Sequence, residues 1–347
     1  MTIRASLSRV DGAVGNFAML ISLAADIAFF RHSFSRTVKD LELDQMVAVA
    51  GGLTGERKAE QDFFLGWGLA FLCGTYCKLL RKRLSYDERK ALVLLAALAA
   101  PYDDLFDKHR ISGEHLHRVL DDLSYTPTSS DERLARRLYR ELIALSPAQG
   151  NTRFHEAMRE LHAAQLDSIH RLNASSPLEL AKEVTYAKAR AGQAAMLALI
   201  TGSNTSPEER DAEAGGAAWV QLCDDALDRR EDRAGGGKTL LTECHRFADA
   251  AEVLERHRIS VFEKYRALRN RDERRREEFL FRWYVLAALS MTYLYLDDEV
   301  ERGALPAIRM RDAIPLACKL IAGYSRDVSM RPIMFPPSDP PERRGSA

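Results

Sequence analysis

Apolar residues recur along most of the chain every three or four positions, and runs that alternate every second position are almost absent. Prolines and glycines interrupt this pattern at intervals typical of helix ends. The pattern therefore predicts an all-α protein. The predicted helices cover residues 13–31, 38–50, 56–83, 87–109, 113–124, 130–146, 151–172, 177–201, 207–233, 246–270, 272–302 and 305–324. No repeat or linker divides them, so we expect one domain over residues 1–330 and a disordered, proline-rich tail over residues 331–347.

The composition is that of a globular protein, because 46% of the 347 residues are apolar, 29% are charged and the formal net charge is zero. A chain without a basic excess lacks the electrostatic surface that nucleic acids attract, so we expect no nucleic-acid partner. The five cysteines are an odd number without a framework spacing, which indicates reduced thiols and a cytoplasmic location.

The run Phe63–Cys77 carries no charge for 15 residues. A helix needs about 20 apolar residues to span a bilayer, and the N-terminus shows no signal-peptide pattern. We therefore expect no transmembrane segment. A buried helix is the favoured interpretation of this run, and a peripheral membrane contact is the alternative.

A first acidic stretch follows a helix body, residues 91–100, that is apolar on every side and so is expected deep inside a bundle. Pro101 is expected to kink or restart this helix. Asp103, Asp104 and Asp107 come next, spaced so that Asp103 and Asp107 share a helix face. Carboxylates near a buried segment are costly unless they are paired or bind a metal. The alternative is a helix end that emerges into solvent.

A second acidic stretch, Gln221–Thr239, reads as a helix that ends at its glycines. Asp224, Asp228 and Asp232 stand at i, i+4 and i+8, so all three share the face that carries Gln221. Like charges at this spacing repel each other, and a hard cation with oxygen ligands such as Mg²⁺ would neutralise them. The alternative is a solvated helix face on which the interspersed arginines form salt bridges.

The two stretches together resemble motifs of the class I isoprenoid synthases. Asp103-Asp104-Leu105-Phe106-Asp107 resembles the first aspartate-rich motif of that family. The segment from Gln221 to Asp228 resembles the second motif of trans-prenyl diphosphate synthases. Continued to Asp232, the same stretch is also similar to the motifs of squalene and phytoene synthases and of terpene cyclases.

This resemblance implies a single large helical bundle of the isoprenoid synthase type with a central apolar cavity. It implies about three Mg²⁺ ions and a prenyl diphosphate substrate, whose departing diphosphate the metal ions would stabilise. The implied metal ligands are Asp103, Asp104, Asp107, Asp224, Asp228 and Asp232. The implied substrate-binding residues are Lys188, Arg190, Gln221, Arg233 and Lys238, of which Arg190 and Lys238 are the candidate catalytic residues.

The resemblance leaves the reaction open. The second-substrate motifs of chain-elongating enzymes are poorly matched at residues 55–58 and 108–110, so a terpene synthase that acts on one prenyl diphosphate is favoured. A prenyltransferase, either chain-elongating or squalene/phytoene-type, is the first alternative. A non-catalytic helical partner subunit is an alternative of another class. Substrate length, product and oligomeric state, including a homodimer, stay open.

Overall fold

The computed structural model shows an all-α protein, as the periodicity predicts, and its described residues contain no strand. The structure describes residues 3–51, 58, 61–62, 64–107, 109, 111–171, 177–202, 205–236, 238–268, 271–305 and 310–322. The tail expected to be disordered, residues 331–347, lies outside these ranges. So do the poorly matched residues 55–57, 108 and 110.

From α5 onward the helix bounds follow the predicted ranges closely, whereas α1 begins ten residues before its predicted range and the predicted helix 56–83 is described as a π-helix and an α-helix within residues 64–80. The elements are α1 (Ile3–Asp40), α2 (Leu43–Ala50), the π-helix η1 (Phe64–Gly68), α4 (Leu69–Leu80), α5 (Tyr86–Asp107), α6 (Gly113–Asp121), α7 (Ser130–Ala144), α8 (Thr152–Arg171), α9 (Leu178–Thr201), α10 (Pro207–Gly235), α11 (Phe247–Ala267), α12 (Glu273–Glu301) and α13 (Met310–Ala322). Another difference is that α1 extends through residues 32–40, because no glycine or proline stops it there. It ends at a turn in which Glu42 takes the left-handed conformation.

The chain forms two compact units. The larger unit comprises Ser22–Gln221 and Lys264–Phe279, and the smaller unit comprises Met1–Ile21, Leu222–Glu263 and Leu280–Ala347. Helices α1, α10, α11 and α12 each contribute residues to both. The units are described separately.

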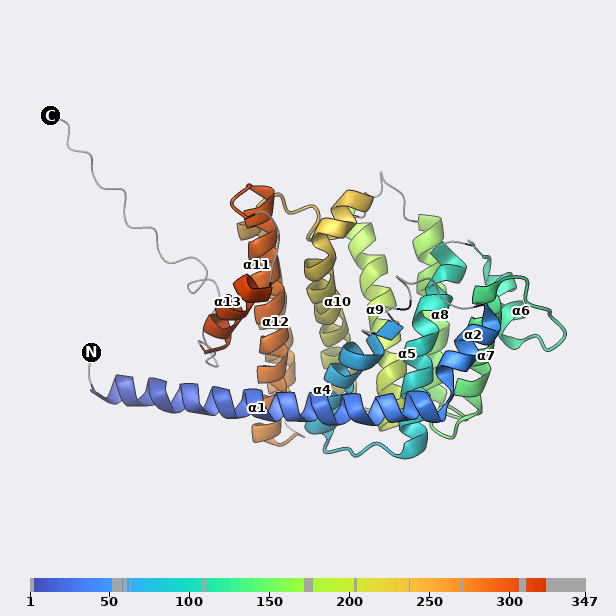
Figure 1. Ribbon diagram of the computed structural model, residues 1–347, viewed down its shortest axis with the longest axis horizontal. Coiled ribbons are helices and arrows are strands. Elements are labelled where there is room, and N and C mark those ends of the chain that lie inside the picture. The colour runs from blue at the N-terminus through green and yellow to red at the C-terminus, as the bar shows by residue number, and fades with distance from the viewer. Residues whose placement is uncertain are drawn as a thin grey trace. The chain divides into compact units, whose positions relative to one another are not determined.

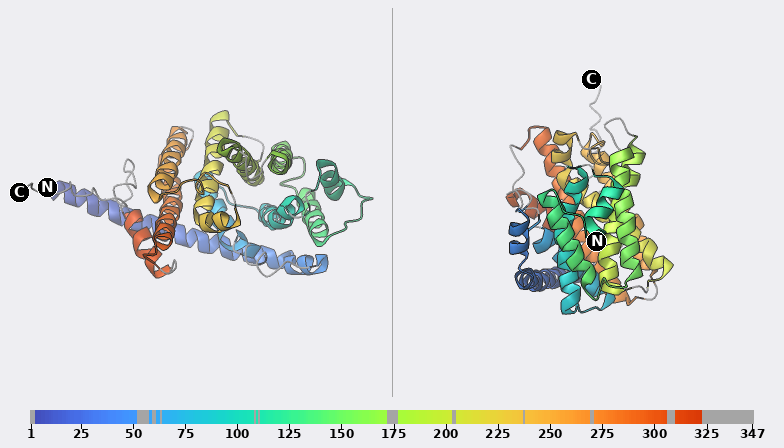
Figure 2. Two further views of the ribbon diagram at one scale, coloured as in Figure 1. Left: turned by 90° about the horizontal axis from the view of Figure 1, so that it is seen from above. Right: turned by 90° about the vertical axis from the view of Figure 1, so that its right-hand side faces the viewer.

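In the larger unit α8 packs along α9, and α5 packs along α7 (Figures 1 and 2). The apolar body of α5 is the centre of this unit, since Leu92, Val93 and Ala97 have no exposed surface. The predicted deep burial of this helix is therefore confirmed. Its start is fixed by a capping box: Ser85 Oγ accepts from the Glu88 amide at 3.1 Å, and the Glu88 carboxylate accepts from the Ser85 amide at 2.7 Å.

Within the charge-free run, residues 64–77 form η1 and most of α4. Within α4, Leu69, Ala70 and Cys73 are almost completely buried, so the favoured interpretation of a buried helix is confirmed for the described residues.

The smaller unit joins the second half of α10 to α12 and α13. Ser290 Oγ donates to the Cys223 carbonyl at 3.3 Å, and Tyr284 Oη donates to the Leu320 carbonyl at 3.1 Å. Its core contains large aromatic side chains such as Trp283 and Phe262. Over the whole chain the five cysteines are free thiols, as expected.

Candidate functional site

The first aspartate-rich stretch occupies the last turns of α5. The helix runs through Pro101 without restarting, so of the two expected effects of this proline the restart is wrong, and the kink stays a prediction. Proline has no N–H, so the carbonyl four residues earlier, at Ala97, loses its helical donor. Gln61 Nε2 donates to that carbonyl at 3.2 Å, and its side chain is buried. The replacement donor satisfies the orphaned carbonyl, so the proline is tolerated inside the helix.

Hydrogen bonds from α8 reach Asp103 and the neighbouring Tyr102 near the end of α5. Gln165 Nε2 donates to Asp103 Oδ1, and Tyr102 shares a hydrogen bond with His162 Nδ1. Burial lowers the pKa of His162 to about 4 and raises the pKa of Tyr102, so both are neutral near pH 7. Asp104 has 1% of its surface exposed.

Two of the three predicted metal ligands of this stretch are thus positioned in the larger unit. The third, Asp107, lies in the last turn of α5, and its side chain is outside the described part of the structure.

The second aspartate-rich stretch forms the last half of α10. The helix begins with a capping box between Ser206 and Glu209 and ends at Gly235, with Gly236 at φ 74°. That left-handed conformation favours glycine. The predicted end of the helix at its glycines is therefore confirmed.

Along this half of α10 one face is buried and the other carries the acids. Leu222 and Ala226 are buried, whereas Asp224 and Asp228 are exposed, and Asp232 is half-buried. Burial, and then the neighbouring Glu231, raise the pKa of Asp232. A carboxyl group in this position gains from a cation, which would favour its ionised form. Carboxylate oxygens at helical spacing are also the donor set that suits Mg²⁺.

The arginines of the second stretch anchor α10 within the smaller unit. Arg229 is completely buried, and Arg229 Nη1 is 2.8 Å from Asp297 Oδ2. Arg229 also donates to the carbonyls of Leu241 and Cys244. Burial raises the pKa of Asp297 even though Arg229 opposes this. Arg229 and Arg233 therefore form salt bridges, as the salt-bridged alternative expects, at the back of the helix.

Arg233 takes part in the same anchoring. Arg233 Nη1 is 2.6 Å from Glu301 Oε1, and its other nitrogens donate to the carbonyls of Thr242 and Cys244. Its predicted role in substrate binding stays a prediction. Lys238, the other predicted basic residue here, is half-buried just beyond the end of α10.

The two stretches lie in different units, with Asp103 and Asp104 in the larger and Asp224, Asp228 and Asp232 in the smaller. Among the described residues no group of three His, Cys, Asp or Glu side chains forms a metal-binding cluster. A single site of six carboxylates stays a prediction, since it needs both units and the side chain of Asp107.

The predicted diphosphate-binding residue Arg190 stands at a groove in the larger unit. The groove has a volume of about 550 Å³, lies among α8, α9 and α10, and is lined by alanines and by charged side chains of both signs. Arg190 is exposed there, and no hydrogen bond or ion pair joins it to another described residue. Two other predicted substrate-binding residues are half-buried: Lys188, two residues before Arg190 on α9, and Gln221 on α10.

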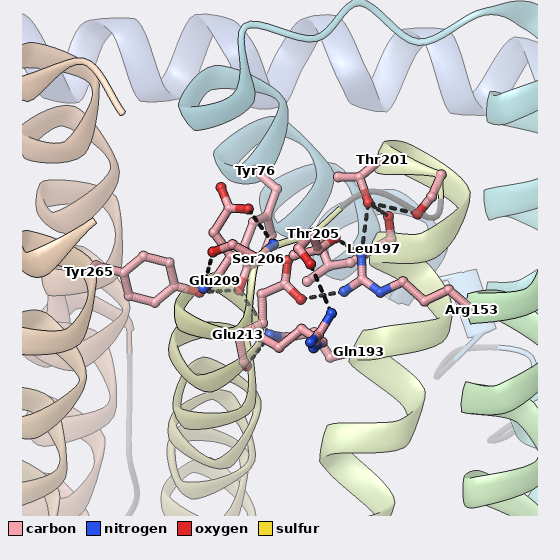
Figure 3. Close-up of polar contacts among 12 residues, drawn as sticks. Tyr76, Arg153, Gln193, Leu197, Thr201, Thr205, Ser206, Glu209, Glu213 and Tyr265 are labelled. Carbon is pink, nitrogen blue, oxygen red and sulfur yellow. Dashed lines mark hydrogen bonds and ion pairs between the residues drawn. The ribbon is translucent and has the colours of Figure 1, made fainter. Parts of the chain in front are cut away.

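A polar network behind this groove was not anticipated from the sequence (Figure 3). Arg153 forms an ion pair with Glu213 and donates to Thr201 Oγ1 at 2.9 Å. Gln193 donates to the Glu213 carbonyl at 2.9 Å and to Tyr76 Oη at 2.8 Å.

Tyr76 in turn shares a 2.9 Å hydrogen bond with Tyr265. Burial raises the pKa of Glu213, although Arg153 opposes this. These residues come from α4, α8, α9, α10 and α11, so no spacing along the chain could have linked them.

Comparison with protein-family models, with curated proteins and with solved structures finds no match to this chain.

Proposed function

We propose that this chain is a Mg²⁺-dependent class I isoprenoid synthase that ionises an allylic prenyl diphosphate, and specifically a terpene synthase. The proposal rests on the resemblance of the two aspartate-rich stretches to that family. The observation that carries it is that each stretch forms the end of a helix and presents carboxylates there. Asp224 and Asp228 share the exposed face of α10, although their mutual repulsion disfavours that arrangement.

The proposed chemistry begins with heterolysis of the allylic C–O bond. Both electrons of that bond leave with the diphosphate oxygen, and the hydrocarbon becomes an allylic cation. Transfer of a proton from the cation to the departed diphosphate, with or without prior ring closure, then gives the product. When bound, Mg²⁺ would neutralise the charge that develops on the leaving diphosphate.

The residues of the chain have separate tasks in this scheme. The six aspartates hold the metal ions. Arg190, whose guanidinium is exposed and joined to no described residue, contributes positive charge to the diphosphate, together with Lys188 and Lys238. Gln221 lies on α10 one turn before Asp224 and contributes an uncharged donor.

The primary test measures diphosphate release by the purified chain with Mg²⁺ and geranyl, farnesyl or geranylgeranyl diphosphate. We expect release without isopentenyl diphosphate. Release only with isopentenyl diphosphate, or a head-to-head coupled product, would indicate a prenyltransferase instead. No turnover of any substrate by correctly folded protein would contradict the proposal and favour a non-catalytic partner subunit.

The proposed ligands are tested by Asp228→Asn, with Asp211→Asn as the matched control. Both residues are exposed aspartates of α10, but Asp211 pairs with Lys264 at 2.9 Å and lies outside the motif. Removing one metal ligand is expected to lower kcat by roughly 100-fold or more, whereas Asp211→Asn leaves kcat within about twofold. Equal activity of the two variants would remove Asp228 from the site.

A further inference from the structure

The outer face of α1 is apolar over part of its length and basic over the rest. In the part of α1 that belongs to the larger unit, the exposed positions before residue 30 are all apolar. They are Ala24, Ala25, Ala28 and Phe29. The exposed positions that follow, up to residue 40, are all polar. They are Arg31, His32, Ser35, Arg36, Lys39 and Asp40. In the preceding turns of the same helix, Phe17 and Ile21 are also exposed.

The opposite face of α1 is packed against protein. Phe34 is completely buried, and Phe30 approaches α4 so closely that a Cβ at Gly74 would stand 3.2 Å from its ring. The one acidic residue of the apolar part, Asp26, lies 3.9 Å from Lys78 of α4. Helix α1 is therefore packed against the protein along one side. The carboxylate of Asp26 lies near Lys78 and not on the exposed apolar side.

An exposed tryptophan marks the border between the apolar and basic parts. Trp67 of η1 has 46% of its surface exposed, and the guanidinium of Arg31 lies 4.9 Å above its ring. The two line a hollow of about 520 Å³ with Ala24, Ile27 and Ala28. Tryptophan and arginine beside an apolar surface are typical of the level at which lipid head groups meet acyl chains.

Helix α1 differs sharply from the other helix that has the length and composition of a membrane span. An 18-residue window within each of Gly15–Asp40 and Glu273–Glu301 has a mean hydropathy of 1.3, but 78% of the window in the second helix is buried and only 17% of the window in the first. Helix α12 is thus a core helix. Because α1 has one side against α4, lipid cannot surround it, and its free side suits the surface of a bilayer.

We propose that α1 docks the protein onto a lipid bilayer that carries anionic head groups. The apolar face of Ala24, Ala28 and Phe29 enters the acyl boundary, and Trp67 lies at the interface. Arg31, Arg36 and Lys39 meet the head groups. The charge of α1 favours a bilayer over a second copy of the chain as the partner of this face. The exposed basic part carries three cations and only the single carboxylate of Asp40, so it complements an anionic surface.

The test is flotation of the full-length protein with vesicles of phosphatidylcholine alone and of phosphatidylcholine mixed with phosphatidylglycerol. We expect binding to the anionic vesicles that weakens with salt. Phe29→Asp is expected to lower the partition coefficient roughly tenfold or more, because it removes a large apolar side chain and adds a repelled charge. Arg36→Glu is expected to lower it at low salt and to have less effect at high salt.

Leu123→Asp is the matched control. Leu123 is 82% exposed, lies outside α1, and acquires the same charge when substituted, so this variant should bind vesicles like the unchanged protein. Absence of flotation by the unchanged protein, or equal losses for Phe29→Asp and Leu123→Asp, would overturn the proposal. A soluble dimer that Phe29→Asp dissociates, without vesicle binding, would instead assign the face to a second copy. Removal of the helix from the mature chain, detected by N-terminal sequencing, would also overturn it.

Discussion

The ends of α5 and α10 carry similar aspartates but are held in place by different interactions. At the end of α5 two supporting groups are uncharged: Gln165 donates to Asp103, and neutral His162 shares a hydrogen bond with Tyr102. At the end of α10 the supports are ion pairs, from Arg229 to Asp297 and from Arg233 to Glu301.

The difference in support follows from how deeply the aspartates of each helix are buried. Along α5 the aspartates themselves lie close to the core: Asp104 is almost completely buried, and Asp103 accepts from the side-chain amide of Gln165. Along α10, Asp224 and Asp228 face outward. Arg229 and Arg233 anchor the other side of the helix through ion pairs. On α10, the arginines that anchor the helix therefore lie next to the aspartates that are the candidate metal ligands.

The largest expected effect comes from breaking the buried ion pair. Arg229→Ala should lower the free energy of unfolding by about 3–5 kcal/mol, because it leaves the Asp297 carboxylate buried without its partner. Arg230 is exposed on the same helix, and Arg230→Ala should change this free energy by less than about 0.5 kcal/mol. Urea unfolding of both variants measures the two values. Equal effects would show that the ion pair does not anchor α10.

The next effect concerns the pH dependence of the α5 support. Burial lowers the folded-state pKa of His162 from 6.5 to about 4, so the unfolded chain binds a proton more readily. Stability from this residue is complete above pH 6.5 and is lost as the pH falls toward 4, by roughly 3 kcal/mol in total.

The measurement compares urea unfolding of the unchanged protein and His162→Gln at pH 7 and at pH 4.5. The variant cannot titrate at this position, so the difference between the two proteins isolates the histidine. If both proteins lose the same stability over this interval, His162 does not contribute to the acid sensitivity.

A smaller effect should follow from the donor that permits Pro101. Gln61→Leu is expected to lower the free energy of unfolding by about 1–3 kcal/mol, because the buried Ala97 carbonyl loses its donor. Gln45 is exposed on α2, so Gln45→Leu serves as the control and should be nearly neutral. Thermal unfolding followed by circular dichroism distinguishes the two. A neutral Gln61→Leu would mean that the helix accommodates the proline in another way.

The smallest effect separates the acidic faces directly. Added Mg²⁺ should raise the free energy of unfolding of the unchanged protein more than that of Asp228→Asn, by less than about 1 kcal/mol, because Asp228 is a proposed metal ligand on the exposed face of α10. Calorimetry with and without the metal measures the two gains. Equal gains would show that Asp228 does not hold the metal.

Much of the fold was predictable because helix signals are local. The capping box of Ser85 and Glu88, the apolar body of α5 and the glycines after α10 are each readable from a few neighbouring residues. The supports of the candidate site were not predictable. Gln165 lies 62 positions from Asp103, and Asp297 lies 68 positions from Arg229, so no local pattern connects them.

The sequence by itself determined where the helices lie and that carboxylates stand at the ends of α5 and α10, because periodicity and capping act within a few residues. Only the tertiary structure decided which apolar helix is covered. The 18-residue apolar windows of α1 and α12 have the same mean hydropathy, yet only 17% of the window in α1 is buried, against 78% of the window in α12. Hydropathy belongs to each segment, whereas burial depends on the surface that the rest of the chain brings against it.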